Sequence, residues 1–112
     1  MAKPTSRAHS RYAKEACELL GALIHEARVE HRMTVAELAE RAGVSRGLVN
    51  RAESGDIGCS IGAVFEMAAI LKVGLFDLSP DGLSRYLSMK QDKLNLLPKS
   101  VRKSKASVQD DF

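Results

Sequence analysis

A chain of 112 residues with no tryptophan and only 4% aromatic residues is long enough for one small domain with an aliphatic core. The formal charge of +3 permits an anionic partner, but residues 19–97 carry nine basic and ten acidic side chains. The excess positive charge therefore lies at the two ends, and any surface for nucleic acid in the middle must be a local patch.

Several classes of protein are not expected. No apolar run approaches the roughly 18 residues of a membrane span, and the basic N-terminus lacks the apolar segment of a secretory signal. Cys17 and Cys59 form no CxxC pair and have no histidine at ligand spacing. We therefore expect a cytoplasmic protein with reduced thiols and without metal or cofactor. No phosphate loop or nucleophile–base constellation is present, so no enzyme is expected.

The first helix is expected from about Ser10 to Arg32, after a flexible arm at residues 1–9. Apolar side chains recur there at steps of three and four residues, which is the period of an amphipathic helix. The positions expected to face the core are Cys17, Leu20, Leu23, Ile24 and Ala27.

Two short helices follow, at residues 35–42 and 46–53. Thr34 is a good N-cap for the first of them, and Glu37 three residues later completes a capping box. Gly43 ends that helix as a residue with positive φ, and Ser45 caps the next. The expected inward positions are Val35, Leu38, Ala39 and Ala42 in one helix and Leu48, Val49 and Ala52 in the other.

The last two helices are expected at residues 61–73 and 81–97. Ser60 caps the fourth helix and Gly74 ends it, with Ile61, Val64, Phe65, Ala68 and Leu71 facing inward. Pro98 ends the fifth helix, whose leucines at 83, 87, 94 and 97 either cover the core or form a dimer seam. Residues 98–112 are polar and are expected to form a disordered tail. The predicted fold is all-α.

Residues 35–54 fit a helix-turn-helix. Such a motif needs a small residue where the two helices touch, a permissive residue in the turn, and apolar residues around it. Ala39, Gly43 and Val44 meet these requirements. Two short helices cannot bury enough surface alone, so they pack at a fixed angle against flanking helices. The second helix can then enter a DNA major groove about 12 Å wide.

The stretch "MTVAELAERAGVSRGLVNRAESG" resembles the Xre family of bacterial and phage repressors. The resemblance extends roughly from residue 19 to residue 78 and implies a five-helix, lambda-repressor-like domain at residues 10–78. It also implies an ion pair between Arg28 and Glu53, which ties the first helix to the third. The family often has glutamine where this chain has Val35, and a longer side chain where it has Gly47.

The same resemblance implies that the DNA-facing residues of the third helix are Ser45, Arg46, Gly47, Asn50 and Arg51. The chemistry of these side chains agrees. Ser45 lies at a helix N-terminus, which suits a phosphate. Arg46 and Arg51 can pair with guanine, and Asn50 with adenine or a phosphate oxygen. Thr34 and Ser60, at two other helix starts, complete the predicted DNA-binding set.

The whole arrangement is also similar to HipB-like antitoxins, which repress their own operon and bind a HipA-like Ser/Thr kinase toxin. This second resemblance rests on the length and composition of the tail, where Asp110, Asp111 and Phe112 would contact the toxin. Because one domain reads only a half-site, a homodimer on a double-stranded operator is expected. A stand-alone phage-type repressor, a restriction–modification controller and a protein-interaction module without DNA binding stay open as alternatives.

Overall fold

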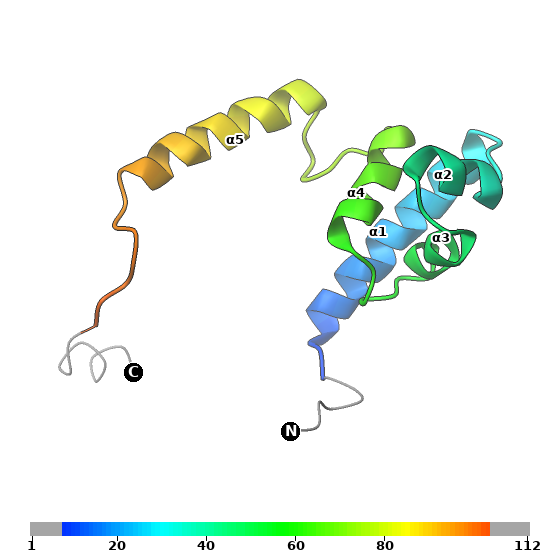
Figure 1. Ribbon diagram of the computed structural model, residues 1–112, viewed down its shortest axis with the longest axis horizontal. Helices are drawn as coiled ribbons and strands as arrows, with labels where there is room; N and C mark the ends of the chain where they lie inside the picture. The colour runs from blue at the N-terminus through cyan, green and yellow to red at the C-terminus, as the bar shows by residue number, and fades with distance from the viewer. Residues whose placement is uncertain (1–7, 104–112) are drawn as a thin grey trace. The chain divides into compact units, whose positions relative to one another are not determined.

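The structure is a computed structural model that describes residues 8–103 (Figure 1). Those residues form five α-helices and no strand. The helices are α1 (Arg11–Glu30), α2 (Val35–Ala42), α3 (Arg46–Glu53), α4 (Ile61–Ile70) and α5 (Pro80–Asn95). The chain divides into two compact units, one ending at Asp77 and the other beginning at Leu78. The all-α prediction is confirmed, and the fold is consistent with a lambda-repressor-like domain. Residues 10–78 contain four helices and not the five that the resemblance implied, because the fifth helix begins at Pro80 in the second unit.

Each of the five helices has a serine or threonine N-cap, and four of these side chains make a capping hydrogen bond. The hydroxyls of Ser10, Thr34, Ser45 and Ser79 each accept a hydrogen bond from a backbone N–H three residues later. Ser60 is the N-cap of α4, but its side chain makes no capping bond. The fifth helix starts at Pro80, one residue earlier than expected, because proline suits the first helical position. It ends at Asn95, two residues before the predicted end at residue 97.

The first four helices end in the same hydrogen-bonded turn, in which a residue with positive φ lets two N–H groups bond back to the last helical carbonyls. Gly43 and Gly55 hold that position after α2 and α3, whereas Arg32 and Lys72 hold it after α1 and α4. The prediction that α4 runs to Val73 was therefore wrong. Lys72 turns the chain, so α4 ends at Ile70.

The core of the first unit is aliphatic. Its fully buried large side chains are Ile24, Leu38, Val49, Met67 and Leu71. Two expected core positions are more exposed than predicted: Ile61 is 70% exposed and Leu23 is 39% exposed. Met67, which the pattern did not select, takes the central place in α4. Every residue of α4 except Glu66 is apolar or glycine, so its pattern lacks the polar face that would define its orientation.

Helix α3 packs on α1 and α2, and α2 also packs on α4. The contact between α1 and α3 is very close at Gly21, where a Cβ atom would collide with the backbone carbonyl oxygen of Ala52. Gly21 is buried, and only a residue without a side chain lets the two helix backbones approach this far. The sequence did not single out this glycine.

Helix α5 belongs to the second unit and buries none of its residues. Leu87, Leu94 and Leu97 are each about half exposed or more, and Lys90 lies over the ring of Tyr86 at 5.3 Å. Within the described part of the chain, the residues after α5 form no further helix.

Candidate nucleic-acid interface

Helix α3 has two opposite faces. Val49 and Ala52 are buried, and Leu48 is half-buried on the same side. At 100° per residue, the other side of the helix carries Arg46, Gly47, Asn50 and Arg51, all of which are exposed. The core face therefore fixes how α3 is rotated. Of the seven residues predicted to bind DNA, the four that belong to α3 lie together on its free face.

The turn before α3 is set by backbone geometry. Gly43 has φ 69° and ψ 34°, in the left-handed region, and the N–H groups of Gly43 and Val44 bond back to Glu40 and Ala39. Val44 is half-buried against the core. The left-handed residue reverses the chain after α2, so that α3 begins only three residues after α2 has ended.

The predicted phosphate contacts lie at helix starts. The hydroxyl oxygen of Ser45 accepts the N–H of Leu48 at 3.0 Å, which leaves its own proton free to donate. Thr34 and Glu37 form a reciprocal capping box, with bonds of 2.9 and 3.0 Å. The hydrogen bond from the Thr34 backbone lowers the pKa of Glu37, so this carboxylate stays charged. Ser60 is exposed at the start of α4.

Arg51 lies at the C-terminal end of the free face. Its side chain is 59% exposed, and its Nε lies 3.8 Å from Oδ2 of Asp56 in the loop after α3. Oδ1 of the same carboxylate accepts the N–H of Gly58 at 2.7 Å, which holds Asp56 in place. Asp56 therefore limits the directions available to Arg51 without burying it. The sequence pattern did not identify this contact.

Behind α3, Arg28 and Glu53 form an ion pair between α1 and α3. Arg28 Nε donates to Glu53 Oε2 at 2.6 Å, and Arg28 Nη1 donates to the carbonyl of Met33 at 2.8 Å. The two side chains are only 12% and 9% exposed. The pair thus anchors the last turn of α3 to α1 and, through Met33, to the turn before α2.

A histidine adds to this pair. His25 Nδ1 lies 2.6 Å from Glu53 Oε1. A carboxylate can only accept, so this nitrogen carries the proton and donates it to Glu53. His25 lies on the helix surface, with its side chain 56% exposed, and the sequence pattern did not identify its contact with Glu53. Its position three residues before Arg28, on the same helix face, was the only signal.

The electrostatics of Glu53 follow from these partners. Burial alone would raise the pKa of Glu53, but hydrogen bonds from Arg28 and His25, together with the charge of Arg28, outweigh it and lower the pKa. The hydrogen bond to Glu53 likewise raises the pKa of Arg28. Both groups are therefore charged at neutral pH, and each satisfies the other in a site that admits little water.

The geometry of residues 35–54 defines the helix-turn-helix class of DNA-binding proteins: a capped helix, a left-handed glycine, and a second helix with one face in the core and one free. A family model described as a helix-turn-helix domain matches residues 19–78, which is more than half of the chain. The protein belongs to that family. No curated protein and no solved structure matches the chain.

Among residues 8–103, no helix is long and apolar enough to cross a bilayer. In the same range, no three histidine, cysteine or acidic side chains gather in a way that could hold a metal ion. Asp110, Asp111 and Phe112, the residues predicted to bind a protein partner, lie outside the described residues.

Proposed function

We propose that this protein is a sequence-specific transcriptional repressor that inserts α3 into the major groove of its operator. The observation that carries the proposal is the free face of α3, where Arg46, Asn50 and Arg51 are exposed opposite buried Val49 and Ala52. A helix whose rotation is fixed by the core presents the same side chains to every DNA molecule, and base recognition requires this.

The side chains divide by chemistry. Arg46 and Arg51 are forked donors suited to O6 and N7 of guanine, and Asn50 is suited to adenine. The short Gly47 leaves space between them, so phosphate contacts and DNA shape carry part of the specificity. The groups proposed to contact phosphates are the hydroxyls and helix starts of Thr34, Ser45 and Ser60.

Replacement of Arg51 by alanine tests this role. An operator is first selected from random duplexes, and its affinity for wild-type and Arg51→Ala protein is measured by fluorescence anisotropy. Loss of one bidentate base contact should weaken binding by about 1–3 kcal/mol and relax preference at one base position. Arg85→Ala on α5 is the control, because it removes the same charge from an exposed arginine outside the first unit. Equal weakening on every duplex would mean that Arg51 contacts a phosphate and not a base. If no duplex is selected, the proposal that the protein is a sequence-specific repressor is refuted.

We further propose that the repressor is a homodimer. One α3 reads a half-site, and helix-turn-helix proteins commonly pair half-sites about one helical turn apart. Within α5, residues 83, 87, 90 and 94 alternate steps of four and three, the spacing of a coiled-coil seam. Lys90 and half-exposed Leu87 and Leu94 lie on this seam. Leu87→Glu should convert the dimer to a monomer in sedimentation equilibrium, and a monomeric wild-type protein would contradict the proposal.

The biological role we propose is that of an antitoxin that represses its own operon and binds a HipA-like Ser/Thr kinase toxin. This step rests on the resemblance of the tail to those of HipB-like proteins. Deletion of residues 98–112 should weaken the binding of a kinase encoded by the neighbouring gene, which calorimetry measures. The affinity for the operator should stay within about twofold of the wild-type value. Unchanged kinase affinity would refute the role of Asp110, Asp111 and Phe112. A neighbouring gene for a nuclease and methylase, or a phage gene cluster, would favour a different repressor.

One other candidate function has a specific observation in its favour. Gly47 and the slight acidic excess of residues 19–97 suit a protein-interaction module that has lost DNA binding. The salt dependence of the affinity separates the two functions. A DNA-binding repressor should lose affinity steeply as salt rises, because each neutralised phosphate releases counterions.

A further inference from the structure

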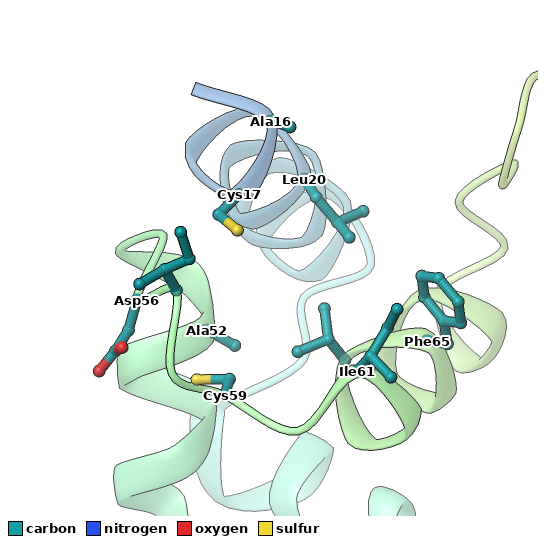
Figure 2. Close-up of a pocket in the computed structure, with 10 residues that line it drawn as sticks. Ala16, Cys17, Leu20, Ala52, Asp56, Cys59, Ile61 and Phe65 are labelled. Atoms are coloured by element: carbon teal, nitrogen blue, oxygen red, sulfur yellow. The ribbon is translucent and has the colours of Figure 1, made fainter. Parts of the chain in front are cut away.

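A cavity of about 280 Å³ opens on the surface of the first unit, beside the C-terminal end of α3 (Figure 2). Its lining comes from α1, the C-terminal end of α3, the loop after α3, and the start of α4. Figure 2 shows Cys17 and Leu20 on α1 across from Cys59 and Ile61. Both cysteines of the chain belong to this lining, and both are free and half-buried.

The lining restricts what the cavity can bind. Asp56 is its only charged residue, and both carboxylate oxygens already have neighbours, the Gly58 N–H and Arg51. The remaining residues are aliphatic side chains, the ring of Phe65 and the two thiols. A carboxylate at the edge disfavours anions, and an otherwise apolar lining favours an uncharged apolar molecule. Because an apolar cavity of about 150 Å³ holds benzene, this one has space for about ten non-hydrogen atoms.

The cavity is connected to the proposed DNA-binding face through two residues. Ala52 belongs to the lining and to α3, where its backbone carbonyl lies against Gly21. Asp56 belongs to the lining and holds its carboxylate 3.8 Å from Arg51 Nε. A molecule that moves α1 away from the loop after α3 therefore changes the packing of α3 on α1. It also changes the distance between Asp56 and Arg51.

We propose that this cavity is an effector site for a small uncharged apolar ligand of about the size of a bicyclic aromatic, and that its occupancy alters DNA binding by α3. The second half of this inference rests on the proposed DNA-binding function. Because coupling between two sites is reciprocal, bound operator must change the affinity for the ligand by the same factor as the ligand changes the affinity for operator.

Indole, an uncharged bicyclic aromatic, serves as the probe for the full chain in calorimetry. The expected dissociation constant is below about 1 mM. Ala16→Leu adds a larger side chain to the cavity wall and should weaken binding by about tenfold or more. Ala22→Leu is the matched control: both alanines are exposed on α1, but Ala22 is not part of the lining. Failure of wild-type protein to bind indole, or equal binding to both variants, would overturn the site.

The thiols give a second measurement that does not involve DNA. Bound indole should slow the alkylation of Cys17 and Cys59 by an uncharged maleimide, because the ligand occupies the space that the reagent must enter. Unchanged alkylation rates at saturating indole would place the bound probe elsewhere on the protein and would overturn the assignment.

The coupling is tested on the selected operator. Saturating indole should change operator affinity of the wild-type protein by about threefold or more. Asp56→Asn keeps the size of the side chain but removes its negative charge beside Arg51, so saturating indole should change the operator affinity of this variant less than that of the wild type. An unchanged operator affinity would overturn the coupling. If no operator is found at all, the repressor proposal fails, whereas calorimetry and alkylation still decide whether the cavity binds a ligand.

Discussion

Arg28 on α1 donates two hydrogen bonds to Glu53 on α3, from Nε at 2.6 Å and from Nη2 at 3.1 Å. The two residues are 25 positions apart, and together with His25 this pair holds the last turn of α3 against α1. Its near-burial makes each partner depend on the other. An isolated charge in such a site is costly, whereas an ion pair with satisfied hydrogen bonds is tolerated.

Removal of one partner should therefore destabilise the fold strongly. We expect Arg28→Met to lower the free energy of unfolding by about 3 kcal/mol, because it leaves the Glu53 carboxylate without its main donor. Urea denaturation of the variant checks this. The double variant Arg28→Met, Glu53→Leu should recover part of the loss, since no buried charge remains. A double variant as unstable as the sum of both single changes would show that the two residues do not act as a pair.

The same pair predicts how stability depends on pH. The pKa of Glu53 is lower in the folded protein than in the unfolded chain, where it is about 4.3. Its contribution is therefore complete above pH 4.3 and is lost as the pH falls through the folded-state pKa, because the unfolded chain binds the proton first.

The measurement is urea denaturation as a function of pH. Glu53→Gln should be less stable at pH 7 and should lose less of its remaining stability than the wild type between pH 6 and pH 3. The stability of the variant should still fall somewhat toward low pH, because the pKa of Glu37 is also lowered by folding. Identical slopes in variant and wild type would mean that folding does not lower the pKa of Glu53.

Replacement of Gly47 by alanine separates the effect on stability from the effect on DNA recognition. A Cβ atom there would meet only the Ser45 hydroxyl oxygen, at 3.8 Å, so alanine fits without strain. Alanine is also the better helix former, and Gly47→Ala should raise the free energy of unfolding by about 0.5–1 kcal/mol. If the free face of α3 lies in the major groove, the added methyl should change operator affinity or base preference. Greater stability with unchanged DNA binding would remove Gly47 from the interface.

The helix-ending turns give a contrasting pair of changes. Lys72 has φ 59°, which costs a residue with a side chain about 1–2 kcal/mol. Lys72→Gly relieves that strain at the expense of a more flexible unfolded chain, so a net gain of about 0.5–1 kcal/mol is expected. Gly43→Ala makes the opposite change, at φ 69°, and should lose about 1 kcal/mol or more. Thermal unfolding of both variants tests the assignment, and a stabilised Gly43→Ala would contradict it.

The sequence predicted the local features well, because they depend on neighbours. The capping residues Thr34 and Ser45 and the turn at Gly43 all have short-range signatures. It failed where the signal depends on distant residues. Met67 replaced Ile61 in the core because α4 has no polar face, and His25 meets Glu53 across 28 positions. The positive φ values of Arg32 and Lys72 could not be read from residue types that seldom adopt them.

The approach of Gly21 to Ala52 makes the C-terminal end of α3 a pivot. Helix α3 is eight residues, about 12 Å, long, and its C-terminal turn is held both by this contact and by Glu53. A small tilt therefore moves Ser45 and Arg46 much further than Arg51. If α3 lies in the major groove as proposed, Arg51 keeps its position while the N-terminal end of the helix adapts to the local width of the groove.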